Sequence, residues 1–497
     1  MSLLVALPIL IPMLTGALSL VLWRSHFSQR LLAIGGTAAM LAVSVALLWQ
    51  VLDGGVLVLA AGGWPAPFGI ILAADALGAV LTLMTGLTGL AVAIYSVSTV
   101  GRGLETSGYY PLMHLLLAGV AGAFLTGDIF NLYVWFEVLL LASFALLAMG
   151  GERAQMAGAI KYVVLNLVSS ALFLTAIGLL YGLAGTLNMA DLAVKLDAVE
   201  APERVTVIAT LFMLAFGIKA AAFPLFFWLP ASYHTAPVAV SALFAGLLTK
   251  VGVYALYRSL TLLFTQDVAF THGVLQWVAV GTLLAGVGGA MVQSEFRRVL
   301  AFAHIGQIGY LFLGLSLLTQ LSLTGGVFYL VHHIIVMSNL FFIAGVVFGV
   351  TGSHRIDNIG GLWKSHTWLG VLFLICALSL SGIPPLSGFW AKFIIIKAAV
   401  VVDAWALVAA ALLAGVLTLY AILRVWLSVF WAPAPHPSSA PPPAVPRAIG
   451  AVLVILTMGT VALGLGGEAL WSLADTAAGQ LLDRDAYIEA VLGDRAP

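Results

Sequence analysis

Four ionisable residues lie inside stretches of sequence that are otherwise apolar. Glu137 stands near the middle of residues 128–149, DIFNLYVWFEVLLLASFALLAM, and Lys219, Lys250 and Lys392 lie well inside other apolar stretches. Holding a charged group at bilayer depth costs from about 3 to above 10 kcal/mol, so such groups usually face a hydrated path and carry ions or protons. These residue types in this setting predict a protein that handles protons inside a membrane.

Two adjacent histidines, His332 and His333, lie in the middle of a further apolar run, VFYLVHHIIVMSNLFF. An imidazole with its ordinary pKa near 6.5 can exchange protons at working pH. Asn339 follows His332 by one heptad and therefore lies close to the same helical face. Metal binding by the histidine pair is not expected, because adjacent helical positions point about 100° apart. The alternative interpretation is that both histidines are hydrogen-bonded packing residues.

The buried charges also have structural interpretations. Glu137 could belong to a structural ion pair, or the boundary of its helix could lie elsewhere. Lys219 and Lys250 could extend along their helices to the membrane surface, as lysines near helix ends do. A shift of one helix boundary could bring Lys392 closer to the outer surface. Of the twenty acidic residues, Glu137 is the only one near the middle of a predicted span, which favours a functional role.

A glutamate and a lysine in this setting could control one another. At 4 Å and an effective dielectric constant near 20, opposite charges attract by roughly 4 kcal/mol, and at 10 Å by roughly 1.7 kcal/mol. Burial already favours the neutral form of a lysine. We therefore expect that a movement of Glu137 relative to Lys219 decides whether this lysine holds its proton.

The composition is that of a membrane protein. The chain has 497 residues, of which 62% are hydrophobic and 8% charged, too few polar residues to cover a soluble domain. Apolar windows of about 20 residues, enough to cross a bilayer core about 30 Å thick, can be placed about fourteen times. These predicted spans begin near residues 2, 31, 70, 109, 128, 157, 205, 235, 272, 298, 322, 366, 402 and 449. We expect an all-α polytopic membrane protein with a single membrane domain over residues 1–497.

Loop charges predict the orientation of the chain. Placing both termini outside puts most loop arginines, among them Arg24, Arg102 and Arg297, on the cytoplasmic side, as the positive-inside rule requires. We expect the membrane to be a bacterial plasma membrane. Residues 432–446, APAPHPSSAPPPAVP, are proline-rich and predict an extended cytoplasmic loop. The single cysteine, Cys376, excludes a disulfide within the chain.

A proline interrupts the seventh predicted span. In FGIKAAAFPLFFWLP, Pro224 follows Lys219 by five residues and cannot donate a hydrogen bond to the carbonyl of Ala220. A free carbonyl at bilayer depth requires a partner from protein or water. The break therefore predicts local hydration beside Lys219.

Two prolines interrupt the twelfth predicted span in the same way. In SLSGIPPLSGFWAKF, Pro384 and Pro385 free the carbonyls of Leu380 and Ser381, shortly before Lys392. The second break thus also predicts hydration beside a lysine.

The positions of the two breaks indicate a repeat. Each broken span is the fourth member of a five-span block, spans 4 to 8 over residues 109–260 and spans 9 to 13 over residues 272–430. A block with an odd number of spans reverses direction when it is repeated, as in transporters built from inverted repeats. We therefore expect two inverted five-helix repeats that contain the broken helices 7 and 12.

Three segments resemble a known family. They are GDIFNLYVWFEVLLLASFALL, FGIKAAAFPLFFWLPASYHTAPVAVSALFAGLLTKVGVYALYR and SGIPPLSGFWAKF. Together they resemble the proton-translocating antiporter-like family shared by respiratory complex I and Mrp-type cation/proton antiporters. The resemblance covers spans 3 to 13. Within the family, PLFFWLPASYHTAP followed by LLTKVGVYALYR most resembles the D-subunit branch of the Mrp antiporters.

The resemblance implies that six buried residues move protons. They match the family's fifth-helix glutamate, its seventh-, eighth- and twelfth-helix lysines and its eleventh-helix relay, and are Glu137, Lys219, Lys250, Lys392, His332 and His333. The chain departs from the family at Ala231, where many members carry an acid after the Leu-Pro pair, and at residues 432–446. Partner contacts at these two places need not follow the family.

The sequence as a whole favours a proton-translocating subunit of a multisubunit antiporter, in which protons move inward while Na⁺ or K⁺ leaves. The driving force would include about 2.3 kcal/mol per charge for each 100 mV. Two alternatives stay open, a proton-pumping subunit of a redox complex such as complex I or a membrane-bound hydrogenase, and a proton channel coupled to an uptake partner. We expect no cofactor and no enzyme activity in this chain, other membrane subunits as partners, and no nucleic acid. A dehydrated Na⁺ requires a cluster of oxygen ligands, and Glu137 is a single carboxylate. The path of the cation could therefore lie in another subunit.

Overall fold

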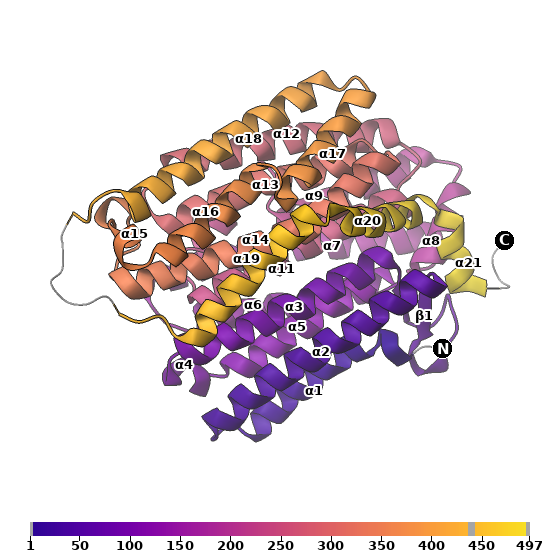
Figure 1. The fold of residues 1–497 in the computed structure, drawn as a ribbon. Coiled ribbons are helices and arrows are strands. Elements are labelled where there is room, and N and C mark those ends of the chain that lie inside the picture. Colours follow the sequence, from indigo (N-terminus) through magenta and orange to yellow (C-terminus); the bar gives the residue numbers. More distant parts are fainter. Residues whose placement is uncertain (1–2, 436–442, 494–497) are drawn as a thin grey trace.

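The computed structural model describes residues 3–435 and 443–493 as a bundle of helices (Figure 1). The expectations for residues 436–442 of the proline-rich segment, and for residues 1–2 and 494–497, lie outside the described residues. Ten helices in the described part are long and apolar enough to cross a membrane. They are α2 (His26–Gly54), α3 (Ala76–Thr99), α6 (Ile129–Ala148), α7 (Arg153–Ala184), α11 (Val238–Leu262), α12 (Val268–Val292), α13 (Phe296–Ser316), α14 (Gln320–Thr351), α18 (Trp405–Trp426) and α19 (Arg447–Leu465).

The other helices occupy the remaining predicted spans and several connections. Three of them are apolar, namely α1 (Leu7–Val21), α5 (Tyr109–Leu125) and α16 (Thr367–Ser381). The others are α4 (Arg102–Thr106), α8 (Met189–Asp197), α9 (Pro202–Ala220), α10 (Trp228–Ser232), α15 (Leu362–Ser365), α17 (Ser387–Val401), α20 (Gly467–Leu482) and α21 (Arg484–Leu492). In Figure 1, β1 (Leu57–Ala60), α8 and α21 lie at one end of the long helices, and α4 and α15 lie at the opposite end.

A β-hairpin that the sequence did not predict precedes α3. Strand β1 pairs antiparallel with β2 (Ile71–Ala74), with Leu57 opposite Ala74 and Ala60 opposite Ile71. The span expected near residue 70 therefore begins at Ala76. Asp75 begins the helix, because its carboxylate accepts a hydrogen bond from the backbone of Gly78 at 2.8 Å.

Helix α14 lies at the centre of the bundle and is buried along most of its length. It packs against α3, α11, α13, α16, α17, α19 and α20. A reciprocal capping box between Thr319 and Ser322 begins the helix, and Gly352 in the left-handed region ends it. The central helix therefore brings His332 and His333 into contact with helices that are distant in sequence.

The first predicted break separates α9 from α10. Helix α9 ends at Ala220, and Ala221 adopts a left-handed backbone with φ 60°. The helix thus stops before Pro224, and Lys219 lies in its last turn. The indole nitrogen of Trp228 donates to the carbonyl of Ile218 at 2.9 Å and so satisfies one of the carbonyls at this helix end.

The second predicted break separates α16 from α17. Gly382 ends α16 with φ 89°, and α17 begins at Ser387. A Cβ at Gly388 would lie 1.9 Å from the carbonyl oxygen of Ser379 and 2.8 Å from the ring of His332. Only glycine fits at this position, so the two half-helices close tightly around His332.

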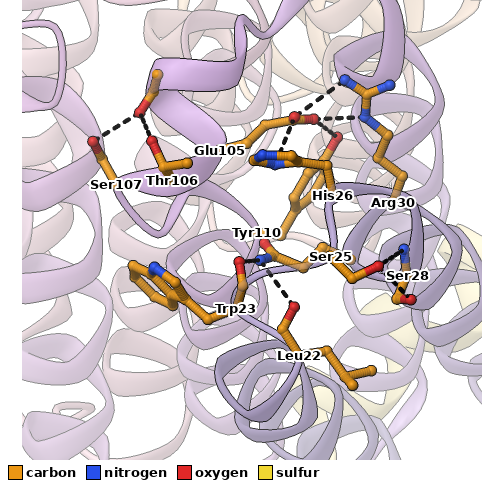
Figure 2. A network of polar contacts seen from close by, with 12 residues as sticks. Leu22, Trp23, Ser25, His26, Ser28, Arg30, Glu105, Thr106, Ser107 and Tyr110 are labelled. Carbon is orange, nitrogen blue, oxygen red and sulfur yellow. Dashed lines mark hydrogen bonds and ion pairs between the residues drawn. The ribbon is translucent and has the colours of Figure 1, made fainter.

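A buried carboxylate ties three helices together at the end of the bundle that contains α4 (Figure 2). Glu105 in α4 is 0% exposed. Its oxygens accept hydrogen bonds from Arg30 Nε at 2.7 Å and Arg30 Nη2 at 3.1 Å, and from the hydroxyl of Tyr110 at 3.2 Å. His26 Nδ1 lies 3.3 Å from Glu105 Oε2. The cluster joins α2, α4 and α5.

A second buried ion pair lies at the opposite end of the bundle. Arg258 of α11 donates to the carboxylate of Asp75, and both side chains are nearly inaccessible. The guanidinium also lies 5.1 Å from the ring centroid of Tyr487 in α21. The described residues after Gly466 are helical and pack on the bundle, with the buried face of α20 against α14.

The Glu105 cluster predicts a loss of stability on truncation. Glu105→Ala leaves Arg30 and Tyr110 without their buried acceptor, which lowers the free energy of unfolding by about 1 to 3 kcal/mol. The thermal unfolding midpoint of the purified protein in detergent should fall. Glu203 is exposed on α9, so Glu203→Ala is the matched control and should leave the midpoint unchanged. Equal midpoints for the two variants would contradict the stabilising role of the cluster.

The second break predicts that Gly388→Ala is not tolerated. The added methyl group overlaps the Ser379 carbonyl, so the variant should lower the unfolding midpoint or prevent accumulation of the protein. At Gly459 in α19, a Cβ would have no atom within 4 Å, so Gly459→Ala is the control. A Gly388→Ala protein as stable as the Gly459→Ala protein would show that the half-helices are not closely packed.

Candidate functional site

Lys219, near the end of α9, lines a small cavity together with residues of α6, α7, α10 and α11. Its side chain is 5% exposed, and Nζ donates to the hydroxyl of Ser170 in α7 at 3.3 Å. The ammonium also lies 4.7 Å from the ring centroid of Phe136 in α6, a cation–π contact. The lysine therefore has neutral partners in direct contact.

Glu137 follows Phe136 on α6 and is the charged neighbour of Lys219. It is half-buried, and its Oε1 atom is inaccessible and has no hydrogen-bond partner among the described residues. Within the described part of the chain, no basic nitrogen lies within 4.0 Å of its carboxylate. The structural ion pair considered for Glu137 is therefore not formed within these residues.

Helices α9 and α11 meet closely between Lys219 and Lys250. A Cβ at Gly252 would lie 2.6 Å from the backbone nitrogen of Ala220, so the glycine allows the close approach. The side chain of Leu248 lines the small cavity beside Lys219. No polar contact among the described residues joins the two lysines directly.

Lys250 is 0% exposed in the middle of α11, which rules out an extension to the membrane surface. Its ammonium donates to the carbonyl of Ala245 in the same helix. The preceding residue, Thr249, has its hydroxyl 3.0 Å from Nε2 of His304 in α13. Lys250 thus lies next to the Thr249–His304 hydrogen bond, which joins α11 to α13 in the second half of the chain.

His304 and His333 form a stacked pair between α13 and α14. Their ring centroids lie 4.8 Å apart with an interplanar angle of 29°. Both side chains are fully buried, and His304 Nδ1 and both ring nitrogens of His333 have no partner among the described residues. Unpaired buried nitrogens are uncommon and point to bound water or a functional role.

His332 extends from α14 to the second break. Its Nδ1 atom lies 2.8 Å from the hydroxyl of Ser387, the first residue of α17. The ring of Tyr329 lies 5.3 Å from that of His332 and 5.7 Å from that of His333. Asn339 contacts α19 through Thr457 at 2.8 Å, so it lies on the same side of α14 as predicted but in a separate contact.

Lys392 binds one of the carbonyls that the proline break was expected to free. Its Nζ donates to the carbonyl of Leu380 at 2.8 Å and lies 4.3 Å from the ring centroid of Tyr310. The side chain is 5% exposed and lines a cavity of about 310 Å³, together with Ser381 and Gly382. The second break therefore places a partner and open space beside the lysine.

The six predicted residues fall into two groups. Glu137 and Lys219 form the first, and Lys250, His333, His332 and Lys392 form the second. His304, which lies near the start of the span predicted from residue 298, completes the second group. His114 lies apart in α5, with both ring nitrogens buried and without partners among the described residues.

The small polar residues of the site carry no recognisable signal in the sequence. Ser170, Thr249 and Ser387 are single hydroxyl residues in apolar helices, and such residues usually bond to their own helix. Within residues 3–435 and 443–493, no three His, Cys, Asp or Glu side chains gather as a metal site would require. The arrangement is suited to proton exchange among nitrogen and oxygen atoms.

Comparison with known proteins identifies the family of this chain. Residues 126–418 match the transmembrane model of the NADH:quinone oxidoreductase/Mrp antiporter family. The D subunit of the Na⁺/H⁺ antiporter of Alkalihalophilus pseudofirmus is 41% identical over 492 residues, which are 99% of this chain and 100% of the relative.

Two solved structures have the same fold over nearly the whole chain. A chain of the Mrp complex from Dietzia sp. DQ12-45-1b has a TM-score of 0.92 and 34% identity, covering 99% of this chain and 100% of that chain. A chain of the archaeal membrane-bound sulfane sulfur reductase has a TM-score of 0.91 and 29% identity, with 99% of each chain covered. The chain belongs to the NADH:quinone oxidoreductase/Mrp antiporter family and, within it, to the D subunits of Mrp-type antiporters.

Proposed function

We propose that this chain translocates protons through Glu137, Lys219, Lys250, His333, His332 and Lys392 as part of a monovalent cation/proton antiporter. This proposal rests on a run of buried titratable groups, Lys250, His304, His333, His332 and Lys392, in which the Thr249–His304 hydrogen bond and the His304–His333 ring stack join α11, α13 and α14. The run crosses from α11 in the first expected repeat to α13, α14 and α17 in the second.

The hydrogen-bond partners of the three buried lysines favour a role in proton exchange rather than in permanent ion pairs. The ammonium groups of Lys219, Lys250 and Lys392 bind a hydroxyl or a backbone carbonyl, which are neutral acceptors. A neutral acceptor stabilises the charged lysine less than a carboxylate does, so proton loss costs less. Water molecules beside the unpaired histidine nitrogens would join the groups into one path.

Glu137 would act as a switch on Lys219. The attraction between the two charges falls from roughly 4 kcal/mol at 4 Å to roughly 1.7 kcal/mol at 10 Å for an effective dielectric constant near 20. A small movement of α6 against α9 therefore changes how tightly Lys219 holds its proton. The proton gradient would drive the outward movement of Na⁺ or K⁺.

The exposed face of α6 that contains Glu137 is the expected contact site of a partner subunit. Val134 and Leu141 are 39% and 67% exposed and share a helical face with Glu137. A half-buried carboxylate at bilayer depth cannot face lipid without a large cost. Another membrane subunit would therefore cover this face and supply a partner for the carboxylate.

The topology that fits this function has fourteen spans, with α9–α10 and α16–α17 as the broken seventh and twelfth. Two inverted repeats would cover residues 109–260 and 272–430 of a single membrane domain, and each contains one broken helix beside a lysine. The end of the bundle with the hairpin, α8 and α21 would face outside, with both termini (Figure 1). The end with α4 and α15 would face the cytoplasm of a bacterial cell.

A proton-pumping role in a redox complex is the second candidate, because the sulfane sulfur reductase chain has the same fold. The higher identity to Na⁺/H⁺ antiporter subunits favours the antiporter. Exchange in vesicles that contain the purified complex, with Na⁺ or K⁺ but no electron donor, separates the two functions.

Lys219→Ala should abolish cation-dependent proton exchange. A proton-transfer group contributes at least about 100-fold to a rate, so the initial rate of pH change in these vesicles should fall by about that factor. Lys161 is exposed on α7, and Lys161→Ala is the control that should exchange normally. Both variants must be present in the purified complex in normal amounts. Normal exchange by the Lys219→Ala complex would refute the proposed path.

A further inference from the structure

Three buried hydroxyl groups surround the Nδ1 side of His332. Ser387 Oγ lies 2.8 Å from His332 Nδ1 and 2.6 Å from Thr460 Oγ1. Ser379 Oγ lies 2.9 Å from Thr460 Oγ1 and 3.3 Å from Ser387 Oγ. Ser379, Ser387 and Thr460 come from α16, α17 and α19, and none of them is more than 1% exposed. We call these three residues the hydroxyl triad.

When Nδ1 of His332 carries no hydrogen, every hydroxyl proton of the hydroxyl triad can find an acceptor. Each hydroxyl donates one hydrogen bond and can accept two. Ser379 then donates to Thr460, Thr460 donates to Ser387, and Ser387 donates to the imidazole. Every hydroxyl proton has an acceptor in this arrangement.

When Nδ1 carries a hydrogen, this hydrogen and every hydroxyl proton of the hydroxyl triad can also find an acceptor. The imidazole then donates to Ser387, which turns its own proton to Thr460, and Thr460 donates to Ser379. Ser379 closes the ring by donating to Ser387 at 3.3 Å. Because hydroxyl groups rotate freely about their C–O bonds, the two arrangements interconvert without movement of the heavy atoms.

We propose that Ser379, Ser387 and Thr460 are positioning residues that allow Nδ1 of His332 to gain and lose a proton inside the apolar interior. This inference rests on the relay role proposed above for His332. It adds α19 to the proton path, although Thr460 lies beyond the residues 126–418 that match the family model. His333 has no such partners among the described residues, so the two adjacent histidines differ in function.

Close packing around the hydroxyl triad holds the imidazole ring of His332 in one position. Gly388 leaves no space between the Ser379 carbonyl and the imidazole of His332. The ring therefore cannot turn away from Ser387 without moving α17. The hydroxyl groups, which are free to rotate, are the part of the site that responds to the proton.

Other titratable groups face His332 from the helices packed around it. They are Tyr329 and His333 of α14, Lys392 of α17 and, beyond His333, His304 of α13 and Lys250 of α11. Cys376 of α16 bonds to Asn339 and Thr457, away from the triad. Within residues 443–465, α19 carries no acidic residue, lysine or histidine.

Removal of one hydroxyl affects the two proton states of His332 differently. Without Thr460 or without Ser379, the bare Nδ1 state still pairs every remaining hydroxyl proton. The protonated state then leaves one buried hydroxyl proton without an acceptor, because the ring can no longer close. The protonated state is disfavoured, so a lower pH is required to reach it.

The test is the pH profile of cation-dependent exchange by the intact complex in vesicles. Thr460→Val and Ser379→Ala should each shift the pH of half-maximal exchange to lower values by about one unit, a tenfold change in proton affinity that corresponds to about 1.4 kcal/mol. Thr460→Ser keeps the hydroxyl and should restore the normal profile. Thr457→Val removes a buried hydroxyl one turn earlier, which bonds to Asn339, and is the control expected to keep the normal profile.

The outcomes separate this inference from the proposed function. His332→Ala should abolish exchange if the histidine belongs to the relay, and retained exchange would refute the relay role itself. If His332→Ala abolishes exchange while Thr460→Val and Ser379→Ala keep the normal profile, the relay role stands and the triad has no part in it. Two variants from different helices keep the test decisive if one of them fails to assemble.

Discussion

The cost of holding a charge in an apolar interior is the constraint on which this structure depends. The chain meets it in two ways. Ion pairs at the two ends of the bundle, Glu105 with Arg30 and Asp75 with Arg258, tie helices together. Between the two ends, the buried lysines Lys219, Lys250 and Lys392 bind neutral acceptors. In the described part of the chain, none of these three lysines has a carboxylate within 4.0 Å. The charges at the ends are fixed by ion pairs, whereas no ion pair within the described residues fixes the charge of Lys219, Lys250 or Lys392.

The broken helices provide the neutral acceptors at the cost of regular backbone hydrogen bonds. Lys392 binds the carbonyl of Leu380 because α16 ends one residue later, and the cavity beside it lies at the same break. The tight closure at Gly388 then holds His332 against the start of α17. One interruption of the backbone thus supplies a lysine partner, open space and a fixed histidine, which are the parts that a proton path needs.

The sequence predicted the features that depend on composition and on single residue types. Apolar length predicted the spans, and the rarity of charges inside them selected Glu137 and the lysines. Proline chemistry predicted the free carbonyl of Leu380 that Lys392 binds. The sequence did not predict the β-hairpin, the central place of His304 or the hydroxyl triad. Ser379 and Thr460 are 81 residues apart, and isolated hydroxyl residues in apolar helices show no periodicity, so only packing brings them together.

A single hydrated path would join the buried groups from Lys219 to Lys392. The sharpest check of this path is a density map of the purified complex at a resolution that shows ordered water. We expect water molecules within hydrogen-bond distance of the unpaired nitrogens of His304 and His333, and between Lys219 and Lys250. A well-ordered map in which these nitrogens are dry and only apolar side chains separate the lysines would contradict it.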